Sequence, residues 1–160
     1  MILLSQAIIL KTPQFPRGCR GAKDALSRMS ISCIVAETIW LSIASTRTAT
    51  PDQLSVLHFL FGKNFEKATK IVDGNGVKRI SGDPSGRTIF KVTPPFSGKE
   101  EYFCFPENYC GCYSFFYGVV NRGEQHCCKH QLAARLAEAL STCVDIKVLD
   151  PELALLLARL

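Results

Sequence analysis

CGCYSFFYGVVNRGEQHCCKH, residues 110–130, is the stretch of sequence that decides the fold. It holds two pairs of metal-binding residue types, Cys110 with Cys112 and Cys128 with His130, and the members of each pair are two positions apart. In extended backbone, side chains two positions apart point to the same side, so the two pairs can converge on one ion. The alternative is four unrelated buried residues, because free cysteine is often buried. Two such pairs within 21 residues favour a metal site.

The chemistry of these four side chains indicates zinc. Three soft thiolates and an imidazole suit tetrahedral Zn²⁺. A full set of four protein ligands is typical of a closed, structural site, and it leaves no open position for a catalytic water. The pattern therefore predicts one structural Zn²⁺, and a binding protein rather than an enzyme.

The ligand spacing also predicts the local backbone. Positions i and i+2 of a helix face apart, so Cys128 must precede a helix and His130 must lie in or near its first turn. Gly111 lets the chain bend between the first two ligands. Residues 113–122 are expected to form a compact helix or turn that brings the two pairs together. Four other cysteines are expected to be small core or surface residues rather than ligands: Cys33, Cys104, Cys127 and Cys143.

The rest of the sequence predicts an α+β fold, with a helical N-terminal part, a small antiparallel β-sheet, and a zinc finger followed by helices. Thr50, Pro51 and Gln53 form a strong helix start with a capping box. Alternating hydrophobicity and turn residues indicate strands, and four-residue apolar spacing indicates helices. The expected helices are 33–45, 51–61, 64–72, one through Leu132, Leu136 and Leu140, and one from Asp150; the expected strands are 77–81, 87–92 and 101–105.

The expected division of the chain follows these elements. Residues 1–30 are a leader or disordered tail, 31–73 a helical segment, 74–140 the zinc finger region with its small sheet, and 141–160 a C-terminal helix. The leader is acid-poor and holds scattered Arg and Ser, so an organellar transit peptide is the alternative to a dispensable tail. Met29 is a plausible second start.

Composition narrows the classes of function. The 160-residue chain has a net charge of +5, of which residues 1–30 contribute +4. The remaining residues are close to neutral, so the overall charge does not indicate a nucleic-acid-binding surface. Any contact with nucleic acid would have to be local. No run of about 18 apolar residues exists, so no membrane partner is expected. The first ten residues are apolar, but they lack the basic start and the clear cleavage site of a secretory signal peptide. We therefore expect the protein to be in a reducing compartment.

The Cys-x-Cys…Cys-x-His pattern resembles the SWIM-type zinc finger. The small Shu-complex SWIM family of eukaryotes is similar in three further stretches, QLSVLHFLFG, ISGDPSGRTIF and CCKHQLAARLAEAL. In sequence, these stretches look close to plant members of that family. The resemblance covers about residues 37–160 and leaves out residues 1–30. It carries the four zinc ligands over without departure, and Ala133 also fits the family pattern.

This resemblance implies a nuclear protein of homologous recombination repair. Such proteins pair with a RecA-type recombinase paralogue as a heterodimer and promote recombinase filaments on single-stranded DNA. The implied role for this chain is therefore a zinc-binding adaptor in DNA recombination.

Two other functions stay open from the residues themselves. The first is direct single-stranded DNA binding, with Arg122, Lys129 and Arg135 as candidate contacts and Tyr113 or Tyr117 stacking on bases. A solvated charged face and a core aromatic stripe are the alternatives there. The second is thiol chemistry at Cys127 beside His126. It is disfavoured because neighbouring side chains in extended chain face opposite sides and no third, orienting group can be named.

The partner surface is expected on two unusually apolar helices. The helix at 51–61 has apolar residues on every side, and the C-terminal helix has a similar excess. Such helices are either deeply buried or bound to a partner, and the sequence favours these two alternatives about equally. The candidate partner-binding residues are Leu57, Phe59, Leu60, Leu153, Leu156 and Leu157.

Overall fold

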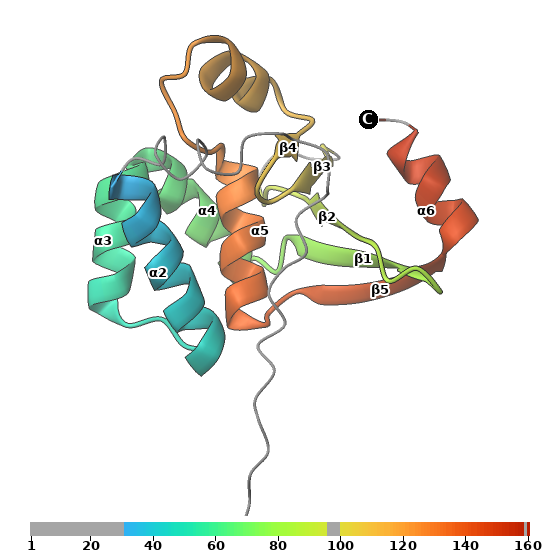
Figure 1. Cartoon of the computed structure of the whole chain (residues 1–160), viewed down its shortest axis with the longest axis horizontal. Helices are drawn as coiled ribbons and strands as arrows, with labels where there is room; N and C mark the ends of the chain where they lie inside the picture. The colour runs from blue at the N-terminus through green and yellow to red at the C-terminus, as the bar shows by residue number, and fades with distance from the viewer. Residues whose placement is uncertain (1–30, 96–99, 159) are drawn as a thin grey trace, which may run out of the picture. The chain divides into compact units, whose positions relative to one another are not determined.

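The computed structural model describes residues 31–95, 100–158 and 160, and residues 31–160 gather into one compact unit. The predicted leader, residues 1–30, lies outside the described residues. The fold is α+β, as predicted, with helices on a five-stranded sheet (Figure 1). In chain order the elements are α2 (Ile31–Thr46), α3 (Pro51–Phe61), α4 (Lys63–Asp73), β1 (Val77–Asp83), β2 (Thr88–Val92), β3 (Tyr102–Phe105), β4 (Tyr109–Cys110), the π-helix η1 (Phe115–Asn121), α5 (Lys129–Leu140), β5 (Val144–Leu149) and α6 (Asp150–Leu157).

The helical part begins with caps that the sequence encodes locally. The Thr50 hydroxyl accepts a hydrogen bond from the Gln53 backbone N–H, and the Gln53 side chain accepts one from the Thr50 N–H, which confirms the predicted capping box. Helix α4 instead begins at Lys63, and its N-cap is Gly62, with φ +55°, rather than the predicted Asn64. The Asn64 side chain donates to the Gln125 side chain and to the Cys127 carbonyl, at 3.0 and 3.3 Å. It therefore ties α4 to the segment that precedes the second ligand pair.

The sheet has the strand order β4-β3-β2-β1-β5. The predicted strands at 77–81, 87–92 and 101–105 are present as β1, β2 and β3, and they pair antiparallel. Strand β5 was not predicted, and it pairs parallel to β1, so the sheet is mixed rather than antiparallel. The prediction of a purely helical segment at 141–160 is therefore wrong for residues 144–149. Helix α5 supplies the crossover that a parallel pair needs.

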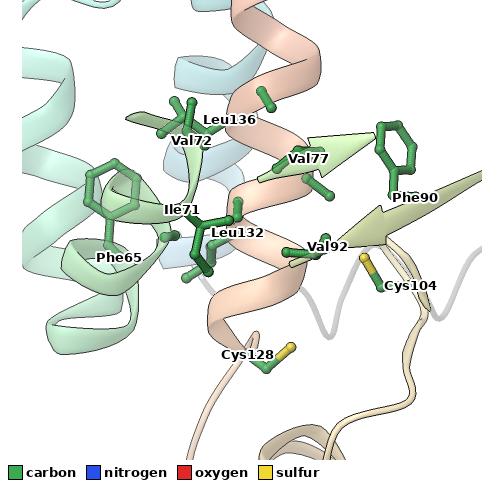
Figure 2. Packing of buried hydrophobic residues seen from close by; sticks show 14 of the residues in the cluster. Phe65, Ile71, Val72, Val77, Phe90, Val92, Cys104, Cys128, Leu132 and Leu136 are labelled. Carbon is green, nitrogen blue, oxygen red and sulfur yellow. The ribbon is translucent and has the colours of Figure 1, made fainter. Parts of the chain in front are cut away.

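The main core lies where α5 packs between the helical layer and the sheet. Figure 2 shows Leu132 and Leu136 of α5 between side chains of α4 on one side and of the sheet on the other. Ala133 and Ala134 are fully buried, so small side chains let α5 approach its neighbours closely. A smaller cluster covers the opposite sheet face, where Leu153 of α6 packs with strand residues. No helix within the described ranges is long and apolar enough to cross a membrane.

The burial of the two apolar helices corrects part of the predicted partner surface. Leu57 is 0% exposed and Leu153 is 3% exposed, so both belong to the core. They sit on the single face that each helix turns to the rest of the domain. Phe59, in contrast, is 86% exposed. Leu60, Leu156 and Leu157 are half-buried.

Leu57 and Phe59 lie on opposite sides of α3 and allow a matched test of this assignment. We expect Leu57→Ala to lower the free energy of unfolding by about 2–5 kcal/mol, because it leaves a cavity in a fully buried site. Phe59→Ala should change it by no more than about 0.5 kcal/mol. Urea unfolding followed by circular dichroism measures both. Equal losses in the two variants would contradict the burial of one face only.

Candidate metal centre

The four predicted ligands converge in one buried cluster. The sulfur atoms of Cys110, Cys112 and Cys128 and a ring nitrogen of His130 all lie within 4.8 Å of one another. All four side chains are buried. Cys110 ends β4, Cys112 follows it before η1, and the other two ligands lie at the start of α5. The cluster thus joins the edge of the sheet to the central helix.

The start of α5 has the backbone that the ligand spacing requires. Cys128 is the N-cap and is extended, with φ −83° and ψ 166°, while His130 lies in the first turn. The Gln131 side chain accepts a hydrogen bond from the Cys128 N–H at 3.2 Å and donates to the Pro106 carbonyl at 3.4 Å. Gln131 therefore anchors the second ligand pair to the loop between β3 and β4.

The geometry of His130 fits a tetrahedral metal. Its Nδ1 atom lies 3.7 Å from Cys110 Sγ. Two ligand atoms at zinc-like distances and a tetrahedral angle would be about 3.6 Å apart. The Tyr102 ring stacks on the imidazole with centroids 4.2 Å apart and an interplanar angle of 19°, which fixes the ring orientation. Nε2 is buried and has no hydrogen-bond partner among the described residues, whereas Nδ1 lies beside the Cys110 sulfur.

The three thiols strongly perturb one another in this cluster. The pKa of Cys112 lies far below its usual range, because the Cys110 and Cys128 thiols hydrogen-bond to it; the Phe115 N–H also donates to its sulfur at 3.3 Å. The pKa of Cys110 is raised, first by its hydrogen bond with Cys104, and the pKa of Cys128 is raised, first by its hydrogen bond with Cys110. Three thiolates at this spacing need a cation between them. The donor set and its geometry fit a divalent ion in a closed, structural site.

Two neighbours predicted not to be ligands lie outside the cluster. Cys127 is half-buried, and burial raises the pKa of its thiol, which disfavours the thiolate that nucleophilic chemistry would need. Cys104 is fully buried on β3. It pairs across the strands with the ligand Cys110, and no local sequence signal predicts this pairing.

The three candidate nucleic-acid contacts differ in their surroundings. The Arg122 guanidinium lies 4.5 Å from the centroid of the Tyr117 ring and donates to the Tyr117 hydroxyl at 2.7 Å. Lys129 is half-buried. Arg135 donates to both carboxylate oxygens of Glu37 at 2.7 Å, and its side chain is 16% exposed. Arg135 therefore links α5 to α2, and its contact with nucleic acid stays a prediction.

These features define a small α+β protein built around a buried Cys₃His cluster of the zinc-finger type. Three relatives are named zinc finger SWIM domain-containing protein 7. The chain is 35% identical to the one from Homo sapiens over 64% of this chain and 73% of the relative. It is 35% identical to the one from Mus musculus over 78% and 82%, and 38% identical to the one from Danio rerio over 68% and 77%. The chain belongs to this family of SWIM zinc finger proteins. No family model matches the chain, and no solved structure matches it.

Substitution of two adjacent cysteines, Cys127 and Cys128, tests the ligand assignment. Cys128→Ala should release the metal and unfold the domain, because a structural zinc site contributes about 10–16 kcal/mol, as much as the stability of a whole domain. Cys127→Ala changes the adjacent residue and should keep the metal and a near-normal melting temperature. Elemental analysis and thermal denaturation measure the two effects. Equal metal loss in both variants would show that the ligand register is wrong.

Proposed function

We propose that this protein is a zinc-binding adaptor of homologous recombination repair in the nucleus. In this proposal Cys110, Cys112, Cys128 and His130 hold one Zn²⁺, and the domain pairs with a RecA-type recombinase paralogue to promote recombinase filaments. The burial of all four ligands carries the proposal, because an ion enclosed in this way supports a fold rather than facing a substrate. Membership of the SWIM zinc finger family supports the zinc.

An exposed apolar face on α3 supports the partner. Phe59 and Leu60 follow Val56 by three and four residues, so the three side chains lie on one side of the helix. Phe59 is 86% exposed and Val56 is 38% exposed. Large apolar side chains grouped on a surface are typical of an interface. Leu155 of α6, at 66% exposed, marks a second apolar position at the other end of the chain.

Charge substitutions on these faces test the adaptor role. Phe59→Glu should abolish copurification of a RecA-type ATPase from nuclear extract, because it places a charge in an apolar contact, while metal content and melting temperature stay unchanged. Leu155→Glu examines the α6 face in the same way, and Thr38→Glu, at an exposed polar position of α2, is the charge control. Copurification that survives both apolar substitutions would remove these faces as the partner surface.

A second candidate function is direct binding of single-stranded DNA, and the surface formed by η1 and its flanking residues favours it. Tyr113 and Phe116 are 74% and 63% exposed. The rings of Tyr113 and Tyr117 stack with centroids 5.5 Å apart, and Arg122 covers Tyr117. Exposed aromatic rings beside a cation are the elements of a base-stacking platform.

Fluorescence anisotropy with an oligothymidine tests this candidate. We expect Tyr113→Ala to weaken binding by about 1–3 kcal/mol, the usual contribution of one stacked base. Arg122→Ala should also reduce the dependence of affinity on salt. Phe59→Ala is the matched control, because it removes an exposed ring from a different surface. Binding that is absent, or equal in all three variants, would exclude η1 as a DNA-binding element.

A further inference from the structure

The described part of the chain holds a fourth thiol beside the metal cluster. Cys104 on β3 is 0% exposed, and its Sγ atom lies 3.9 Å from the carbonyl oxygen of His130. Its cross-strand neighbour is the ligand Cys110. Because Cys104 is outside the ligand set, its sulfur stays uncoordinated when the other three bind a metal.

The register of the β3–β4 hairpin brings Cys104 and Cys110 into disulfide geometry. The two residues are direct cross-strand partners. The Gly111 N–H donates to the Phe103 carbonyl at 3.1 Å in the next pair along the ladder, so Cys104 and Cys110 form a non-hydrogen-bonded pair. Such pairs have Cα atoms about 4.5 Å apart and side chains on the same face. Disulfides need Cα atoms about 4.4–6.8 Å apart.

The other cysteines of the cluster lack the cross-strand pairing that joins Cys104 and Cys110. Cys112 lies beyond the end of β4, and Cys128 precedes α5. Neither of them has a cross-strand partner in the ladder. The backbone already sets the distance between Cys104 and Cys110, so closing this bond requires little rearrangement.

We propose that Cys104 and Cys110 are a peroxide-sensitive disulfide site that competes with the metal. Hydrogen peroxide oxidises one of the two sulfurs to a sulfenic acid and releases water, and the second sulfur displaces the hydroxyl as another water. In the metal-free site, two thiols and one hydrogen peroxide give one disulfide and two waters. Two sulfur atoms are oxidised and the peroxide is reduced. Cys110 can then no longer bind the ion.

The order of events follows from burial. Cys110 is 2% exposed and Cys104 is 0% exposed, and coordination occupies the Cys110 sulfur. The metal-loaded protein is therefore protected, and the disulfide closes after the metal leaves or the site opens. The metal-bound and disulfide states exclude each other, because both require the Cys110 sulfur. This inference rests on the proposed metal site.

The experiment compares the full-length protein with and without its metal. Metal content is measured first, so failure of the proposed metal site is seen separately. Metal-loaded and chelator-treated samples then receive hydrogen peroxide, and non-reducing digestion with mass spectrometry identifies the crosslinked peptides. We expect the chelated protein to form a Cys104–Cys110 disulfide at least about tenfold faster than the loaded one, and to rebind Zn²⁺ only after reduction. Free Cys104 after oxidation of the cluster, or crosslinks only among Cys110, Cys112 and Cys128, would overturn the proposal.

Variants of Cys104 distinguish disulfide formation from a role in packing alone. Cys104→Ala and Cys104→Ser should both bind Zn²⁺ normally and should recover more Zn²⁺ binding than the native protein after the same chelation and oxidation. Cys143→Ala, which removes a half-buried thiol outside the cluster, should behave like the native protein. If both Cys104 variants lost the metal without oxidant, Cys104 would be part of the metal centre and the proposal would be wrong. An unchanged recovery of Zn²⁺ binding would also refute it.

Discussion

The start of α5 is the constraint on which the rest of the structure depends. Cys128 must be extended and His130 helical for both side chains to face the sulfurs from the β4 end. Once α5 begins there, Leu132 and Leu136 meet the helical layer and the sheet, as Figure 2 shows. Metal ligation and core packing therefore stabilise the same helix. Loss of the ion would leave crowded thiols at the point where the sheet joins the core.

Local rules made much of this structure predictable. The ligand set and the position of Cys128 follow from the difference between extended and helical side-chain directions. The capping box at Thr50 depends on residues three apart, and the first three strands follow from alternation and turn residues. In each case the physical cause lies within a few residues of its effect.

The sequence did not predict features whose cause lies far along the chain. Strand β5 gains its place from β1, where Arg79 makes a bidentate ion pair with Asp145, 66 residues away. Arg135 is held by Glu37, 98 residues away, so its charge is satisfied inside the domain. Leu57 and Phe59 could not be separated by composition, because an apolar helix does not show which face its neighbours cover. Cys104 is a small core residue, as predicted, but its place opposite Cys110 depends on the register of β3 and β4.

The metal site of the domain is formed by buried residues, and the exposed residues are the ones that can contact another molecule. The thiols lie inside, where burial suits a closed metal site and limits reaction with solvent. The side chains that can contact another molecule are exposed, and they include Phe59 on α3 and Tyr113 between the two ligand pairs. Asn64 links these two regions, because it starts from α4 and hydrogen-bonds to the segment after η1. The surface with Phe59 therefore connects to the metal centre through α4, which packs on α3, and the surface with Tyr113 lies on the chain between Cys112 and Cys128.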